Sequence, residues 1–177
     1  DFTDLRAALT RAARGGLTVA LHAIGDAAVD VGLDCFVATG ASGSIEHAQL
    51  LTPEAVQRMA GLGLVARVQP AHLPDDRDPP EACWPGRAHR CFAFRELLDA
   101  GVSLALGSDA PVAGLDPWLA MAAAVHRSAD ERPPWVPEQA ITAAEALAAS
   151  TDGHSTVGVG SPADLALLDS DPLGIQE

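Results

Sequence analysis

Short apolar runs alternate with stretches of helical periodicity along most of this 177-residue chain. Each run has the length of a buried strand, and the residues between successive runs are numerous enough to form a helix. Parallel strands need such long crossover connections, whereas antiparallel strands can be joined by short turns. The alternation therefore predicts an α/β fold with a parallel sheet. The expected strands are 17–22, 44–47, 64–68 and 102–106, and the expected helices are 2–14, 26–38, 53–61, 91–100, 117–127 and 138–149.

Residue types at two expected helix starts can be compared with the preferences of helix N-termini. They support the start at residue 53 better than the start at residue 138. Thr52-Pro53-Glu54 is a favourable start, because Thr can cap the helix, Pro suits its first position and an acidic residue suits its first turn. Thr142 and Glu145 have the spacing of a capping box, but they fall inside the pattern that begins at residue 138. The residues expected to face inward from the helix 26–38 are Val29, Leu33, Phe36 and Val37.

The segment 70–90 is expected to be irregular. Its prolines at 70, 74, 79, 80 and 85 exclude a continuous helix or a central strand. A long loop without regular structure in a compact domain is more often functional than not, so we expect this one to border a site. Closer to the C-terminus, a turn rich in Gly, Ser and Pro precedes a strand-like run at 163–168.

The composition excludes several functions. Eleven basic and 24 acidic residues give a net charge of −13, which disfavours nucleic acid as a partner. The chain has no lysine, so it cannot supply a Schiff-base, phosphate-binding or carbamylated lysine. No apolar run approaches the roughly 20 residues of a membrane helix. Three cysteines without a CxxC pattern suggest reduced thiols and a cytoplasmic location.

Chemistry-bearing side chains stand at the end of every expected strand. The first strand ends at His22, the second at His47, the third is followed by His72, and the fourth by Asp109. The carboxyl ends of parallel strands meet at one edge, so these side chains can converge although they are far apart in sequence. Imidazole and carboxylate are ligands that Zn²⁺ accepts, and a metal-bound water can attack a polarised carbonyl. The strand ends therefore predict a catalytic metal site.

Each of these residues also has a simpler explanation. A single histidine at a strand end is more often a hydrogen-bonded packing residue, and an acidic residue such as Asp26 at a helix start is more often a cap. The joint occurrence at four strand ends is what favours a site. His89, His126 and His154 have no such placement and are expected to be ordinary surface or packing residues.

Two other catalytic arrangements find no support. A serine nucleophile would need a GxSxG elbow, and the segment around Ser108 lacks the second glycine. A cysteine nucleophile would need a nearby histidine, but Cys35 falls within an expected helix, and Cys83 and Cys91 have only His89 close in sequence.

The ordered motifs of the chain resemble the metal-dependent amidohydrolase superfamily, and within it amidohydrolase family 3, the YtcJ-like hydrolases. The resemblance covers residues 17–172. The motifs that carry it are HAIGD, IEHAQLL, QPAHLPDD, RAHRCFAFRELLDAGVSLALGSDAPV, PEQAITAAEAL and GSPADLALLDSDP. Each motif is weak alone, whereas the set in this order is specific.

The resemblance implies a (β/α)8 barrel flanked by a small β-sandwich. The four strands would be barrel strands five to eight, so residues 1–150 would form the C-terminal half of the barrel. Residues 151–177 would form a linker and the strand that returns to the sandwich. The family's HxH pair and bridging carboxylate would then lie upstream, and this chain is expected to be a C-terminal part of a longer enzyme.

The resemblance also assigns roles to individual residues. His22 and His47 match metal ligands, and Asp109 matches a ligand that also carries the proton of the attacking water. His72 and Asp76 match a segment directed toward the substrate, and Arg87 matches an arginine with a positioning role. The implied function is hydrolysis of a carbon–nitrogen bond in a small-molecule amide or cyclic amide, with one or two divalent metal ions, most simply zinc.

Two other interpretations remain open at this stage. The chain could be a catalytically silent piece or pseudoenzyme that serves as a binding or assembly module, or a metal-free α/β domain that binds sugars or acids. Metal content and an upstream HxH pair separate the enzyme from both. A half barrel also exposes two sheet edges, so the chain on its own is expected to associate, for instance as a homo-oligomer.

Overall fold

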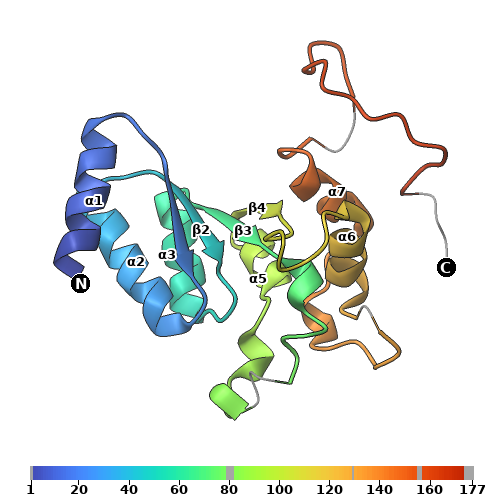
Figure 1. Cartoon of the computed structure of the whole chain (residues 1–177), viewed down its shortest axis with the longest axis horizontal. Helices are drawn as coiled ribbons and strands as arrows, with labels where there is room; N and C mark the ends of the chain where they lie inside the picture. The colour runs from blue at the N-terminus through green and yellow to red at the C-terminus, as the bar shows by residue number, and fades with distance from the viewer. Residues whose placement is uncertain (1, 79–81, 129, 155–156, 174–177) are drawn as a thin grey trace.

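A computed structural model describes residues 2–78, 82–128, 130–154 and 157–173 of the chain. Four strands form one parallel sheet in the order β1-β2-β3-β4, which is also their order in the sequence (Figure 1). The predicted α/β class with a parallel sheet is confirmed. The strands are β1 Val19–Ala23, β2 Gly43–His47, β3 Val65–Val68 and β4 Ser103–Leu106.

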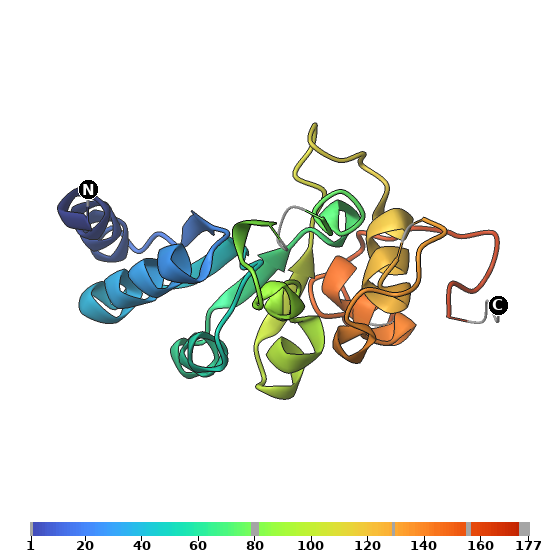
Figure 2. The same cartoon turned by 90° about the horizontal axis from the view of Figure 1, so that it is seen from below.

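The register of the sheet separates an apolar face from a polar one. Ile45 pairs with Leu21 on one side and with Ala66 on the other, and Ala66 pairs in turn with Leu104. Ile45 and Ala66 are fully buried, because α2, α3 and α5 cover this side of the sheet (Figure 2). One residue further along each strand, the paired row is His22, Glu46, Arg67 and Ala105. Of the predicted site residues, His22 therefore belongs to the face that the helices leave open, whereas His47, His72 and Asp109 lie at or beyond the strand ends.

Six α-helices with described bounds lie at or near the positions that the sequence pattern indicates. They are α1 Phe2–Arg14, α2 Asp26–Thr39, α3 Pro53–Leu62, α5 Phe94–Asp99, α6 Pro117–His126 and α7 Ala143–Ser150. Thr52 caps α3 as predicted, since its hydroxyl accepts a hydrogen bond from the Ala55 N–H at 3.1 Å. Asp26 is not the N-cap of α2; that position belongs to Gly25, and Asp26 lies in the first turn.

The inward face of α2 is narrower than expected. Val29, Leu33 and Phe36 are fully buried, whereas Val37 is 61% exposed and the prediction for it was wrong. These three buried residues repeat every three or four positions, and Val37 lies beyond the edge of that stripe. Close packing on the sheet is possible because α2 carries Gly32, where a Cβ atom would lie 2.6 Å from the Leu21 side chain.

Two helices begin later than the pattern suggests. The helix expected from residue 138 begins at Ala143, because Thr142 and Glu145 form a capping box there and fix its start. Pro137–Gln139 forms a separate 3₁₀ turn, η3. The helix expected from Cys91 begins at Phe94. Cys91 instead pairs with Leu50 in an isolated antiparallel bridge, and Phe92 has a φ of 56°, which no helix accommodates.

Two further segments complete the fold. The described part of 70–90 is irregular, as predicted, apart from a short helical piece at 82–83 and two 3₁₀ turns, η1 Pro70–His72 and η2 Ala88–Arg90. The strand expected at 163–168 is not formed: no described strand lies beside it, and Leu165 and Leu167 are exposed. The described tail instead runs along the outside of the molecule (Figure 1). The division into residues 1–150 and 151–177 stays a prediction. No helix among the described residues is long and apolar enough to span a membrane.

Candidate metal centre

The carboxyl ends of the four strands bring His22, His47, His72 and Asp109 to one edge of the sheet. His22 lies near the end of β1 and His47 is the last residue of β2. The other two follow β3 and β4, His72 as the last residue of η1 and Asp109 three residues beyond Leu106. A cavity of about 290 Å³ opens at this edge, and its lining includes His22, His47 and Asp109. The predicted convergence of the strand ends is present.

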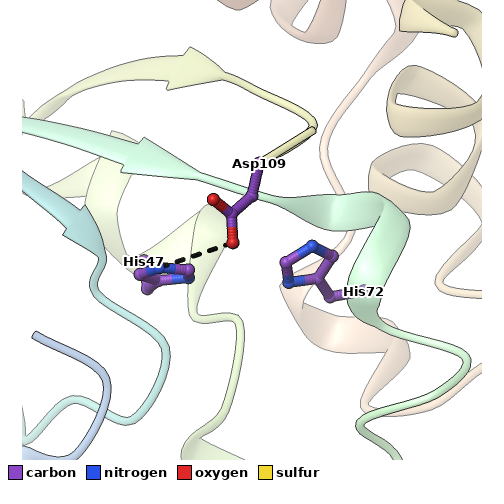
Figure 3. Close-up of side chains that lie close together, drawn as sticks. All are labelled: His47, His72 and Asp109. Atoms are coloured by element: carbon purple, nitrogen blue, oxygen red, sulfur yellow. Dashed lines mark ion pairs between the residues drawn. The ribbon is translucent and has the colours of Figure 1, made fainter. Parts of the chain in front are cut away.

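Three of these side chains offer donor atoms to a common point. Ligand atoms of His47, His72 and Asp109 all lie within 4.8 Å of one another. The Asp109 carboxylate points into the space between the two imidazole rings, with Oδ2 3.9 Å from Nε2 of His47 (Figure 3). This grouping contains donors suited to a borderline cation such as Zn²⁺.

His22 and His72 do not occupy equal positions. The His22 ring meets the His47 ring edge-on, with the centroids 4.6 Å apart, so His22 adjoins the group without belonging to it as the described residues are placed. The His72 ring lies 6.1 Å from His47, at a tilt of 33°. The structure thus brings together all four residues that the strand ends indicated, and it groups His72, which was expected to face the substrate, with His47 and Asp109.

The backbone at two of these residues is held in an unfavourable conformation. His47 has a φ of 70° and Asp109 a φ of 53°, and Ala48, next to His47, has a φ of 46°. Non-glycine residues rarely adopt the left-handed region, and they persist there only when the surrounding structure holds them. Such residues cluster at functional sites. In this chain His47 is the last residue of β2 and Asp109 lies three residues beyond β4, so the left-handed residues stand at or just past strand ends.

The surroundings of His47 favour the neutral imidazole. Its side chain is only 9% exposed. Burial lowers the pKa of His47 below its ordinary value, and the neighbouring His22 and His72 add to this effect, although Asp109 and Glu46 act in the opposite direction. A neutral imidazole keeps a free lone pair for a cation. The electrostatics of the site therefore suit His47 as a metal ligand at neutral pH.

His72 supplies the clearest sign of a missing partner. Its Nε2 atom is buried and has no hydrogen-bond partner among the residues that the structure describes. Buried polar atoms are almost always paired, and an unpaired one calls for a ligand, an ion or another group. His72 belongs to the group around Asp109, so the residues present fit a bound cation together with a polar substrate. A purely structural role for His72 would leave the buried nitrogen unexplained.

The two other predicted site residues, Asp76 and Arg87, are not among the residues that line the cavity. Arg87 forms an ion pair with Asp26 at the start of α2, and its side chain is half-exposed. Trp84 lies close by, since a Cβ atom on Gly25 would be 3.7 Å from its ring. The Asp76 N–H donates to the His72 carbonyl at 2.8 Å. Their proposed contacts with substrate stay predictions.

Three polar residues in the cavity lining, Glu46, Arg67 and Gln69, had no role assigned to them from sequence. Gln69 is 6% exposed, and its side-chain nitrogen donates to the Arg67 carbonyl at 3.2 Å. Glu46 accepts a hydrogen bond from the Ser44 hydroxyl at 2.7 Å and lies 3.7 Å from Nε of Arg67. The signal that could have found them is the same strand-end position that identified the histidines. Cys35 and Cys91 are buried away from this lining.

The whole chain, residues 1–177, matches the model of a family described as the amidohydrolase family. Protein LONG AFTER FAR-RED 3 of Arabidopsis thaliana is 40% identical over 152 residues, which are 78% of this chain and 25% of that protein. An N-substituted formamide deformylase of Arthrobacter pascens is 31% identical and covers 92% of this chain and 33% of its own length. The putative amidohydrolase YtcJ of Bacillus subtilis is 28% identical, over 99% of this chain and 36% of its own length.

The fold has a solved counterpart. An uncharacterised metal-dependent hydrolase of Pyrococcus furiosus superposes with a TM-score of 0.84 and 31% identity, over 98% of this chain and 38% of that one. The resemblance inferred from the ordered motifs is confirmed. The chain spans between a quarter and two-fifths of the length of these relatives.

Proposed function

Because the chain belongs to the amidohydrolase family, we propose that it is part of a metal-dependent hydrolase that cleaves a carbon–nitrogen bond in a small amide or cyclic amide. The observation that carries this proposal is the grouping of donor atoms from His47, His72 and Asp109. It is joined by the buried Nε2 of His72, which has no hydrogen-bond partner among the described residues. The name of one relative, an N-substituted formamide deformylase, describes action on a bond of this class.

Four residues divide the work in this proposal. His22, His47 and Asp109 would hold a divalent metal, most simply zinc, since their imidazoles and carboxylate are its ordinary ligands. Such a metal, when bound, makes water nucleophilic at neutral pH and polarises a carbonyl. The Asp109 carboxylate would accept the proton of the attacking water. Nε2 of His72, which has no partner, would donate a hydrogen bond to the substrate carbonyl oxygen as negative charge develops there.

The proposal extends to the architecture of the whole protein. All four strands are parallel and follow sequence order, and the sheet leaves its polar face open on the side opposite α2 and α3. Those features suit strands five to eight of a (β/α)8 barrel, whose remaining strands would cover the open face and supply the upstream ligands. In this arrangement residues 151–177 would return to a small β-sandwich.

Zinc content tests the ligand assignment. His22→Ala and His47→Ala should each lower the zinc bound per protein in elemental analysis, whereas His89→Ala should leave it unchanged, because His89 is exposed and lies in η2 outside the cavity lining. Unchanged zinc in both strand-end variants would contradict the proposed site. Bound zinc in a full-length protein that hydrolyses no amide would instead favour the silent binding module.

A further inference from the structure

Arg127 is fully buried, although it carries a charge and lies outside the proposed site. It follows the last turn of α6 with a φ of 56°. Its Nε donates to the Trp135 carbonyl at 3.0 Å and its Nη1 to the Phe92 carbonyl at 2.9 Å, and Nη2 lies 3.5 Å from the Cys91 carbonyl. The guanidinium also lies 5.1 Å from the centre of the Phe94 ring. One side chain therefore binds main-chain oxygens from two separate segments.

Placing a guanidinium here is energetically costly. No carboxylate forms an ion pair with Arg127 among the residues that the structure describes. Burial lowers the pKa of Arg127 to about 10, so the side chain is still charged at neutral pH. Only a planar fork of donors can bind the carbonyls of two consecutive residues and of a third at once. The buried guanidinium thus serves to hold main chain in place.

The main chain that Arg127 holds leads directly to the strand ends. The Phe92 N–H donates to the Gln49 carbonyl at 2.8 Å, and Cys91 pairs with Leu50. The same segment that follows His47 is also bound to the end of β1. The Ala48 N–H donates to the Ala23 carbonyl at 3.1 Å, and the Leu50 N–H donates to the Ile24 carbonyl at 2.9 Å.

These bonds form a continuous ladder from Arg127 to the histidines. The main-chain segments that these bonds connect are 91–92, 48–50 and 23–24. The segment 48–50 directly follows His47, and the segment 23–24 directly follows His22. His47 and Ala48 have left-handed backbone angles that only their surroundings can maintain. A loss of donors at Arg127 leaves buried carbonyls unpaired at one end of the ladder and removes that support.

We propose that Arg127 is a positioning residue: through this ladder it fixes the strand ends that present His22 and His47. The inference rests on the proposed metal site, but the ladder itself exists without a metal. Groups that orient metal ligands typically change metal affinity roughly 10–100-fold when they are altered. Arg127 would act in this way through main chain instead of through a direct contact.

Amide hydrogen exchange of the metal-free protein tests the ladder directly. In Arg127→Lys, which keeps the charge and removes the fork, exchange at Ala48, Leu50 and Phe92 should accelerate about tenfold relative to Leu64, whose N–H is bonded to Met59 at the end of α3. Arg95→Met is the matched control, because Arg95 joins α5 to α7 through Glu145 and has no bond to the ladder. In Arg95→Met, exchange at Ala48, Leu50 and Phe92 should accelerate no more than exchange at Leu64.

Metal binding provides a second test of the proposal. Titration with Co²⁺, read from its visible spectrum, should show affinity reduced roughly 10–100-fold and an altered spectrum in Arg127→Lys, but not in Arg95→Met. If the full-length protein without substitutions binds no Co²⁺, the proposed function fails while the exchange data still judge the ladder. If it binds Co²⁺ and Arg127→Lys matches it in affinity, spectrum and exchange, the inference is wrong.

A measurement on the unaltered protein remains decisive if both Arg127→Lys and Arg127→Met fail to fold. Coupling between two sites is reciprocal, so metal binding must slow exchange at the Phe92 amide and at Nε–H of Arg127 if the ladder links them to the site. Unchanged exchange of both protons on metal binding would overturn the inference.

Discussion

Glu145 closes the start of α7 and joins it to α5, and its removal makes a quantitative test of how α7 is held. Its Oε2 accepts hydrogen bonds from the Thr142 N–H at 2.8 Å and from the Thr142 hydroxyl at 2.9 Å. Both carboxylate oxygens also bind Nη1 of Arg95 in α5, at 2.8 and 2.9 Å. Hydrogen bonds from Thr142 and Arg95 hold the pKa of Glu145 below its ordinary value. We therefore expect Glu145→Ala to loosen the start of α7 and its link to α5.

The expected loss follows from these contacts. Removing a helix N-terminal cap costs about 1 kcal/mol. The ion pair adds no more than about 0.5–1 kcal/mol, because about a third of each side chain remains exposed to solvent. The sum is about 1.5–2 kcal/mol, and a loss of that size lowers the melting temperature of a chain of this length by roughly 3–8 °C. Glu145→Gln keeps the capping geometry, so it should lose only the ion-pair share.

Thermal unfolding at neutral and acidic pH measures this loss. A carboxyl whose pKa is lower in the folded protein stabilises above its unfolded pKa and loses that effect as pH falls through the folded pKa. The stability difference between Glu145→Gln and the unaltered protein should therefore vanish in acid. Glu131→Gln is the control, since Glu131 is exposed and has no described hydrogen bond or ion pair. Equal losses in Glu145→Ala and Glu131→Gln, or a Glu145→Gln loss that persists in acid, would refute the reasoning.

Three further predictions concern the site and the sheet. Asp109→Asn should lower turnover roughly 10²–10⁴-fold even where metal is retained, the range expected for a general base; activity within a few-fold of the unaltered enzyme would instead direct attention to Glu46 or Asp26. Because burial and the neighbouring histidines lower the pKa of His47 below 6.5, protonation favours the unfolded chain, so the stability of the metal-free protein should fall as pH drops below 6.5. His47→Gln should make that fall shallower, and an unchanged pH profile would count against the shift. The isolated 177-residue chain should sediment as an associated species, because β1 and β4 are edges of the described sheet; a stable monomer with tightly held zinc and turnover would contradict this.

Much of the site was predictable because it depends on local patterns. An apolar run long enough to be buried determines a strand, and a polar residue at its end determines what that strand presents at the edge of the sheet. His22, His47, His72 and Asp109 could thus be named from their positions alone, and parallel order then placed them together. The capping residue Thr52 was predictable for the same reason, since a cap acts on the few residues that follow it.

Other features depend on contacts between distant segments. Arg127 looks like an ordinary residue at the end of a helix, and only the approach of 91–92 and Trp135 makes it a buried donor. The pairing of Cys91 with Leu50 delays α5 until Phe94, although the sequence pattern is helical from residue 91. The run 163–168 has the composition of a strand but no partner beside it among the described residues.

The sequence by itself therefore determined the parallel α/β class, the family and the residues at the strand ends, because periodicity and strand-end chemistry are local properties. Tertiary structure alone decided how these residues meet. It set the left-handed backbone of His47 and Asp109, left Nε2 of His72 buried without a partner, and turned Arg127 inward. The physical reason is that backbone strain, burial and hydrogen-bond satisfaction arise only when segments remote in sequence pack against one another.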